Sequence, residues 1–306
     1  MEIIHSLENF KYKDKKVVVC LGNFDGVHIG HQKIIKAMID EAKKRKAIPM
    51  LVTFDPHPTS IIKGVVSKKI ITTLRYKMFL IKNLGVPVCF LIKFDEQFAQ
   101  MEAQEFFYKV LLDYLHISAI VVGFNFRFGK AHAGNVEFLE KESKKNNIDF
   151  IAIEPVKVNG EVVSSSKVRD SIEKADFKNA EMFLGRRYAF GGRVVHGKHV
   201  GRTWGFPTAN IIITNECIPP LGVYAVSVRV EESLFDGVAN IGYTSLKSEE
   251  IVLEVYIFNF KEDLYNKDIE IFFVQKIRDE KHFENKEDLI AQIKEDCKQA
   301  EKIFSE

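Results

Sequence analysis

A ten-residue turn, Gly22-Asn23-Phe24-Asp25-Gly26-Val27-His28-Ile29-Gly30-His31, constrains the fold of this chain more than any other stretch. It follows the apolar run at residues 17–21, which is typical of a buried parallel strand. Apolar residues then recur at helical spacing through residues 34–42. The turn therefore joins a strand to a helix at the carboxyl edge of a sheet, which is where open α/β sheets bind ligands.

The residue types of this turn predict an anion site. Glycines at 22, 26 and 30 allow tight turning and a close approach of the backbone to a ligand. The free N–H groups at the start of the following helix attract negative charge. His28 and His31 are one helical turn apart, so we expect both to face the same anion. The spacing matches neither the dinucleotide fingerprint nor a P-loop, and an ordinary glycine turn with two surface histidines is the alternative.

Length and composition limit the classes of protein that remain. The 306 residues suggest two domains, and a net charge of +2 does not indicate a nucleic-acid or membrane partner. The four cysteines lie far apart, which favours buried thiols in a reducing cytosol over disulfides or a zinc site. No signal sequence and no apolar run of membrane-spanning length is found in the sequence, and nothing in it implies a protein partner. We therefore expect a cytoplasmic protein.

Strands and helices are predicted to alternate up to about residue 184. After the strand at 17–21, further strands are expected at 49–54, 86–94, 117–122 and 148–153. Helical spacing marks residues 72–84, 102–115 and 135–145, and two short helices are expected near 167–174 and 177–184. This alternation predicts a Rossmann-like α/β domain, residues 1–184, whose parallel sheet is covered on both faces.

The pattern changes at Gly185. Strand-like segments separated by turns are predicted at 187–195, 222–230, 234–241, 251–260 and 269–277, with no helix between them. They indicate a second domain, residues 185–306, built as an antiparallel β-barrel or sandwich. A last helix is expected to start at Asn285, with Asp288 as its cap partner and an apolar stripe facing the barrel.

Further motifs follow the strands of the first domain. The segment 53–58, Thr-Phe-Asp-Pro-His-Pro, is either a ligand loop or a rigid connector. The segment 121–130, Val-Val-Gly-Phe-Asn-Phe-Arg-Phe-Gly-Lys, offers aromatic rings for stacking and Arg127 for an anion, although a solvated loop is the alternative. The segment 164–169, Ser-Ser-Ser-Lys-Val-Arg, has the hydroxyls of a helix start that can donate to a phosphate.

Two features of the second domain indicate phosphate chemistry. The glycine-rich and cationic segment 191–210 can cradle phosphates with backbone N–H groups, although a hairpin loop is the alternative. Thr208 and Asn210 share one face of an extended segment, which suits a metal–phosphate cluster. In the strand at 251–260, Glu254 lies opposite the aliphatic face, and spacing alone favours a solvated glutamate there.

Taken together, these motifs resemble the bacterial bifunctional riboflavin kinase/FAD synthetase family over nearly the whole chain. The first turn resembles the nucleotidyltransferase signature His-x-Gly-His, and residues 164–169 resemble its second signature. The segments 53–58 and 121–130 match the family in order. In the second domain the run Gly-Phe-Pro-Thr-Ala-Asn at 205–210 resembles the riboflavin kinase signature, and the segments 219–225 and 237–242 follow in the family's order.

The resemblance assigns the groups of the first site. It implies that His28 and His31 bind the phosphates of ATP and that Asn125, where many relatives carry Asp, contacts the reacting phosphate. The remaining nucleotide-binding residues that it implies are Gly22, Phe24, Asp25, Gly26, Ser164, Ser165 and Arg169.

For the second domain the resemblance implies a riboflavin-kinase-type barrel. Glu254 would be the general base for the ribityl hydroxyl, and Thr208 and Asn210 would hold Mg²⁺. The ATP-binding residues implied in this domain are Gly197, Lys198, Gly201, Thr208 and Asn210. Two departures from the family pattern, Tyr243-Thr244-Ser245 in place of Arg-Pro-Thr and Tyr256 in place of a common His, concern the flavin site.

The implied function is FAD synthesis with ATP as co-substrate. Riboflavin would be phosphorylated to FMN, and FMN would be adenylylated to FAD with release of pyrophosphate. One alternative is a single-activity FMN adenylyltransferase with a regulatory flavin-binding barrel. Others are a nucleotidyltransferase acting on another phosphate ester, such as phosphopantetheine, and a class I aminoacyl-tRNA synthetase, although no Lys-Met-Ser-Lys-Ser follows its His-Ile-Gly-His.

Overall fold

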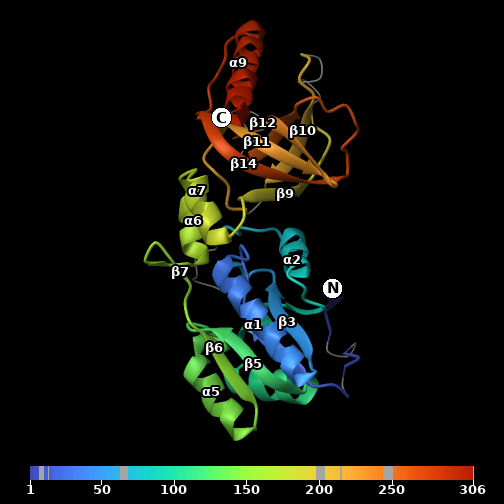
Figure 1. Ribbon diagram of the computed structural model, residues 1–306, viewed down its shortest axis with the longest axis vertical. Helices are drawn as coiled ribbons and strands as arrows, with labels where there is room; N and C mark the ends of the chain where they lie inside the picture. Colours follow the sequence, from blue (N-terminus) through green and yellow to red (C-terminus); the bar gives the residue numbers. More distant parts are fainter. Residues whose placement is uncertain are drawn as a thin grey trace. The chain divides into compact units, whose positions relative to one another are not determined.

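The computed structural model describes residues 1–6, 10–12, 14–62, 68–197, 204–213, 216–243 and 251–305. Its contacts divide the chain into two compact units (Figure 1). The N-terminal unit comprises Met1–Ile70 and Leu74–Ser165, and the C-terminal unit comprises Ile71–Thr73 and Ser166–Glu306. The contact division thus falls inside a helix at Ser165, and the functional boundary at residue 184 stays a prediction.

The N-terminal unit is built on a parallel sheet of six strands in the order β1-β4-β3-β2-β5-β6. The strands are β1 (Glu2–Ile4), β2 (Val17–Leu21), β3 (Ile48–Asp55), β4 (Val88–Lys93), β5 (Ile117–Gly123) and β6 (Asp149–Ile153). All five residues of β2 are buried, as a central parallel strand requires. Strand β1 was not predicted, because three residues are too few to show a pattern.

Helices cover both faces of this sheet, as predicted. On one face, α1 (Ile29–Arg45) and α2 (Leu74–Asn83) pack on Val18 and Cys20 of β2. The alternate residues of β2 face the opposite core. This core contains Phe107 and Leu111, together with Leu139 from α5 (Val136–Lys145). This alternation along β2 confirms the Rossmann-like α/β architecture.

The helix expected at 102–115 is replaced by several shorter pieces. The chain forms α3 (Glu96–Ala99), α4 (Ala103–Glu105) and then a π-helical segment, Phe106–Tyr114. The continuous α-helix was therefore wrong in detail. Over nine residues, the apolar spacing of a π-helix differs too little from that of an α-helix for the sequence to distinguish them.

The segment between β6 and the barrel follows the parallel sheet along the chain. It consists of the hairpin β7 (Lys157–Val158) and β8 (Glu161–Val162), followed by α6 (Ser165–Glu173) and α7 (Phe177–Leu184). Helix α7 ends at Gly185, whose left-handed conformation (φ 68°) terminates the helix. Both helices were predicted at these places.

The C-terminal unit is an antiparallel six-stranded sheet in the order β10-β13-β12-β11-β14-β9. Its strands are β9 (Ala189–Arg193), β10 (Thr208–Ile213), β11 (Gly222–Val230), β12 (Ser233–Tyr243), β13 (Ile251–Ile257) and β14 (Asp268–Arg278). The N–H of Val195 donates to the carbonyl of Asn210 at 2.8 Å, which links the two edges and nearly closes a barrel. Strand β10 was expected only as a short extended segment.

The last helix, α9 (Lys286–Ser305), lies against this barrel, as predicted. Its Ala300 is buried with Val223, Ala225 and Val238 of the sheet. The side chain of Asn285 accepts from the N–H of Asp288 at 2.8 Å, so the predicted cap is present.

The four cysteines are free thiols, and Cys20, Cys89 and Cys217 are buried. Within the described ranges, no helix has the combination of length and apolar character needed to cross a membrane.

Candidate active sites

The first candidate site is the turn between β2 and α1, where the backbone adopts a strained conformation. Phe24, Gly26 and Val27 all have positive φ angles, of 51°, 82° and 43°. Glycine tolerates this region, but a β-branched valine rarely enters it. Strain of this kind costs on the order of 1–3 kcal/mol per residue and is concentrated at functional sites. The turn therefore has a shape that packing alone does not explain.

The turn presents the start of α1 as an anion site. His28 is the N-cap residue, and its Nδ1 accepts from the backbone N–H of His31 at 3.3 Å. An accepting Nδ1 leaves the proton of the neutral ring on Nε2, which can then donate to a ligand. The first turn of α1 carries no acidic residue, so nothing there opposes a bound anion.

The two histidines form a stacked pair. Their ring centroids are 3.6 Å apart with an interplanar angle of 14°. Phe24 contacts the ring of His31 edge-on, with centroids 5.3 Å apart. Because Phe24 is fully buried in the core, it supports His31 from below and does not face the surface of the site.

The His31 side chain is neutral and has an unsatisfied ring nitrogen. Burial lowers the pKa of His31 well below its usual value, and the neighbouring His28 and Lys77 lower this pKa further. In the part of the chain that the structure describes, the buried Nδ1 of His31 has no hydrogen-bond partner. A buried polar atom without a partner is costly, so this nitrogen points to a ligand.

The second serine-rich motif meets this turn directly. The hydroxyl of Ser165 donates to the carbonyl of Asp25 at 2.9 Å, and Asp25 is itself buried. Ser164 precedes this contact, and Arg169 lies one turn further along α6. Two residues 140 positions apart in the sequence are thus brought into contact. The individual roles of these residues stay predictions.

Asn125 lies on the turn that follows β5, the strand next to β2. The N–H of Phe126 donates to the carbonyl of Gly123 at 3.0 Å and closes this turn. Asn125 and Arg127 are exposed, and Phe124 keeps 43% of its surface accessible, which is unusual for a phenylalanine. The loop therefore offers an amide, a cation and an open aromatic face at the carboxyl edge of the sheet.

The second candidate site lies on the barrel, where three strands run side by side. Glu254 of β13 is paired in register with Asn210 of β10 on one side and with Asn240 of β12 on the other. Paired residues in neighbouring strands point to the same face of a sheet. The three side chains are half-buried, so a carboxylate lies between two amides at the surface.

The two faces of β13 differ over most of the strand. Leu253, Val255 and Ile257 are buried, whereas Glu254 and Tyr256 are only half-buried. The contrast fails at the start of the strand, where Ile251 is half-buried and Val252, on the same face as Glu254, is buried. The ring of Tyr256 contacts Phe206 edge-on, with centroids 5.3 Å apart. An aromatic wall therefore adjoins the carboxylate.

The glycine-rich segment 191–210 approaches the row formed by Asn210, Glu254 and Asn240. A Cβ atom at Gly197 would lie 2.6 Å from the side chain of Asn210, so only glycine fits there. The amide of Asn210 donates to the carbonyl of Thr208 at 3.2 Å. Lys198 and Gly201, predicted to bind ATP, lie outside the described residues, as do Thr244 and Ser245.

The side-chain oxygen atoms of Thr208 and Asn210 suit a hard cation. Mg²⁺ prefers oxygen ligands and usually shares them with substrate phosphates. The Thr208 hydroxyl and the Asn210 amide oxygen are ligands of that kind. Across the described residues, no group of three or more His, Cys, Asp or Glu side chains is arranged to hold a metal.

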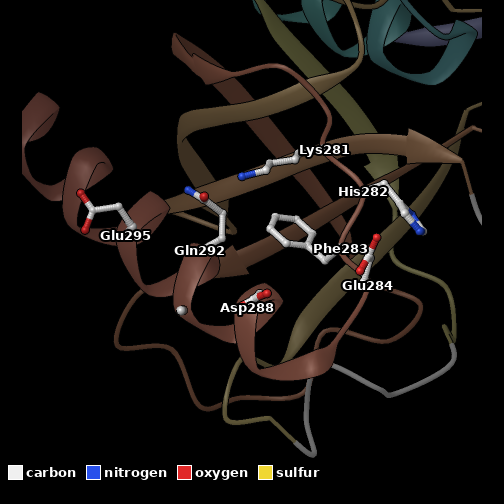
Figure 2. A pocket seen from close by; sticks show the side chains of 8 residues that line it. Lys281, His282, Phe283, Glu284, Asp288, Gln292 and Glu295 are labelled. Carbon is white, nitrogen blue, oxygen red and sulfur yellow. The ribbon is translucent and has the colours of Figure 1, made fainter.

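A pocket of about 470 Å³ lies between the loop after β14 and the first turns of α9 (Figure 2). Its lining consists of Lys281, His282, Phe283, Glu284, Asp288, Ala291, Gln292 and Glu295. The adjoining Glu280 reaches back over β12, where a Cβ at Gly242 would lie 2.6 Å from its carboxylate.

Helix α9 is held at this pocket by a buried ion pair. Arg278 donates to both carboxylate oxygens of Asp296, at 2.8 and 2.9 Å, and Asp296 is 2% exposed. Gln292, which lines the pocket, donates to the same carboxylate at 3.0 Å. A bidentate pair of this kind fixes the helix in orientation as well as in place.

Comparison with known proteins assigns both units. The family model described as FAD synthetase matches residues 10–167, and the model described as riboflavin kinase matches residues 184–304. A bifunctional riboflavin kinase/FMN adenylyltransferase of Buchnera aphidicola is 36% identical over 100% of this chain and 99% of its own length. The protein of that name from Haemophilus influenzae is 33% identical over all of both chains, and that from Escherichia coli K12 is 34% identical over 99% and 98%.

The chain belongs to the bifunctional riboflavin kinase/FMN adenylyltransferase family.

A solved structure covers this riboflavin kinase/FMN adenylyltransferase family member almost completely. The Streptococcus pneumoniae protein, described as a macrolide-efflux protein, superposes with a TM-score of 0.80 and 30% identity over 96% of each chain. The match extends through both units. The resemblance inferred from the motifs is confirmed. The two family matches rule against a class I aminoacyl-tRNA synthetase and against a phosphopantetheine enzyme.

Two residues of this family member, Asn240 and Lys77, were not predicted from the sequence to lie at a candidate site. Asn240 was quoted only within a motif, because its place beside Glu254 depends on strand register. Lys77 was missed because it lies in a helix whose apolar spacing indicates only that one face packs on the sheet. In the structure Lys77 is buried and contacts the turn between β2 and α1. A lysine next to the apolar stripe of α2 was the available signal.

Proposed function

We propose that this chain makes FAD in two ATP-dependent steps, one in each unit. The barrel transfers the γ-phosphoryl group of ATP to riboflavin and forms FMN. In the N-terminal unit the FMN phosphate attacks the α-phosphorus of ATP, which forms FAD and releases pyrophosphate. Relatives named for both activities align with this chain from end to end, which supports the proposal. Both steps are displacements in which a protein acts mainly by positioning groups and stabilising charge.

The stacked histidine pair at the start of α1 is the observation that carries the adenylyl-transfer half of the proposal. His28 would donate from Nε2 to the phosphates of ATP, and His31 would use its unsatisfied nitrogen on the same group. Backbone N–H groups of the strained turn add fixed positive ends of dipoles. Asn125 would meet the reacting phosphate, and Ser164, Ser165 and Arg169 would complete the site.

The row Asn210–Glu254–Asn240 carries the kinase half of the proposal. Glu254 would accept the proton of the ribityl hydroxyl as that oxygen attacks the γ-phosphorus. The flanking amides would orient the carboxylate and meet the phosphate oxygens. A solvated strand glutamate needs no such neighbours, so its position between two amides favours the catalytic role.

Thr208 and Asn210 would hold Mg²⁺ against the phosphates of ATP. When bound, the ion would neutralise charge on those phosphates. Gly197, together with Lys198 and Gly201, would bind the nucleotide, since a side chain at Gly197 would displace Asn210. The pocket beside α9 is in the size range of small-molecule sites, which supports a place for riboflavin there.

Product analysis tests the whole proposal. Riboflavin, ATP and Mg²⁺ are incubated with the full chain, and the flavins are separated by chromatography. FMN should appear first and FAD should follow, with pyrophosphate formed in step with FAD. Formation of FAD from supplied FMN, with no FMN formed from riboflavin, would instead favour a regulatory barrel. The feature in favour of that alternative is Tyr243-Thr244-Ser245, which stands where the family carries Arg-Pro-Thr.

The compartment follows from the chemistry. Three of the free thiols are buried and none is paired, which fits a reducing environment that contains ATP. We therefore infer a cytoplasmic place of action.

A further inference from the structure

Lys77 of α2 is a buried cation beneath the first site. Its side chain is 8% exposed, although lysine is among the residues least often buried. The ammonium donates to the carbonyl of Asn23 at 3.3 Å and to the hydroxyl of Thr53 at 3.4 Å. A third, longer contact of 3.5 Å reaches the carbonyl of Phe54.

These contacts tie two ligand loops together from below. Asn23 belongs to the turn that carries the histidine pair, and Thr53 and Phe54 end the strand that leads into the segment 53–58. The hydroxyl of Thr53 also donates to the carbonyl of Asn23, at 3.2 Å. The turn and the neighbouring loop are thus joined through one cation and one hydroxyl.

Burying a charged group to make these hydrogen bonds costs free energy of desolvation. The three acceptors are neutral oxygens, and burial lowers the pKa of Lys77, opposed in part by the charges of Asp25 and Asp55. A neutral side chain of similar length would fill the same space without the desolvation penalty. A cation kept at a ligand site at this cost indicates a use for its charge.

We propose that Lys77 is a positioning residue for adenylyl transfer, whose buried positive charge helps the histidine turn hold the departing pyrophosphate. This inference rests on the proposed function of the first site. The hydrogen bonds of the ammonium go to the turn and to the end of β3, so it acts through these segments. At low effective dielectric its field extends to the anion above, and its hydrogen bonds hold the Asn23 carbonyl away from that anion.

Burial is the main cause of the lowered pKa of His31, and the charge of Lys77 acts in the same direction. Lys77 and His28 both disfavour an imidazolium at position 31, where burial already does so. A neutral ring has one nitrogen that donates and one that accepts, whereas an imidazolium can only donate. Lys77 therefore contributes both the field and the protonation state of the site.

The test measures the reverse reaction, in which FAD and inorganic pyrophosphate form FMN and ATP. Full-length Lys77→Gln removes the charge but keeps a hydrogen-bonding group, and Lys77→Arg keeps the charge. We expect Lys77→Gln to raise the KM for pyrophosphate about tenfold, which is less than the loss of a direct anion donor causes. Lys77→Arg should recover most of this loss, and riboflavin phosphorylation by the same chains should be unchanged.

Thr53→Val is the matched control, because it breaks the hydroxyl half of the tie and leaves the ammonium in place. It should stay within about threefold of the parent KM for pyrophosphate. An equal loss in Thr53→Val and Lys77→Gln would mean that the tie is only structural and would overturn the proposal. A parent KM for pyrophosphate in Lys77→Gln would also overturn it.

His31→Ala, measured beside these variants, separates this inference from the function on which it rests. If His31→Ala slows FAD formation and Lys77→Gln keeps the parent KM for pyrophosphate, only the role of Lys77 is wrong. If His31→Ala leaves FAD formation at the parent rate, the histidine site itself is wrong, and the role of Lys77 is wrong with it.

Discussion

The two candidate sites are built in opposite ways. The adenylyl-transfer site lies on a strand-to-helix turn, and most of its groups come from ten consecutive residues whose backbone is strained. The kinase site lies on regular strands, and its row consists of Asn210, Asn240 and Glu254, each from a different strand. The first site is determined by local conformation, and the second is determined by strand register.

This difference has consequences for how each site responds to change. A turn that offers backbone N–H groups and two rings can lose one ring and still bind an anion. A row with a single carboxylate has no substitute for it.

The largest effect is expected from dividing the chain. A fragment of residues 166–306, which follows the contact division, should phosphorylate riboflavin and form no FAD, because the histidine turn is absent. Chromatography of the flavin products measures both activities. A folded fragment that forms no FMN would contradict an independent kinase unit.

The matched control is the shorter fragment 185–306, which begins at the functional boundary and lacks α6 and α7. Phe177 of α7 packs against Tyr188 and Phe273 of the barrel, with ring centroids 6.3 and 5.6 Å apart. Loss of a buried phenylalanine typically costs about 3–5 kcal/mol. We expect this fragment to unfold at clearly lower denaturant concentration than 166–306, and equal midpoints would show that α7 contributes nothing.

Glu254→Gln should slow riboflavin phosphorylation by about 10²–10⁴, since glutamine keeps the size and hydrogen bonding but cannot accept the proton. Formation of FAD from supplied FMN should be unaffected. Initial rates of the two steps, measured separately, give the comparison.

Glu232→Gln is a suitable control, because Glu232 is an exposed carboxylate at the turn between β11 and β12. It should leave both rates at the parent value. If Glu254→Gln behaves like Glu232→Gln, Glu254 is only a surface residue of the strand.

Replacing both His28 and His31 by alanine should reduce adenylyl transfer by about 10²–10³, the usual range for losing an anion-stabilising donor. The kinase step should be spared. His5→Ala, which changes an exposed histidine far along the sequence from the turn, serves as the control. Parent rates of FAD formation in the double variant would remove the pair from the site.

The smallest effect concerns pH. The pKa of His31 is lowered by burial, so the folded N-terminal unit takes up its proton only well below the usual value of about 6.5. The unfolded chain binds this proton first as the pH falls, so the stability of the unit should decline below about pH 6.5 and not above it. Denaturant titrations at several pH values measure this decline, and His31→Gln should flatten it. The same decline in His31→Gln would assign the effect to another group.

Much of the fold could be predicted from the sequence because its signals are local. The burial of β2 and the cap of α9 at Asn285 follow from short patterns and are present in the structure. Strand β1 and the π-helical segment Phe106–Tyr114 were missed. The first gains its stability from pairing with β4, and the second differs from an α-helix only in hydrogen bonding.

The candidate turn between β2 and α1 could be predicted from the sequence, because adjacent residues carry its glycines, its helix start and both histidines. The position of Glu254 between Asn210 and Asn240 could not, since register between strands depends on the whole sheet. The burial of Lys77 against the carbonyl of Asn23 likewise depends on tertiary packing. The surroundings of a lysine cannot be predicted from a helical pattern alone. They depend on what the helix packs against, which here is the ends of two strands.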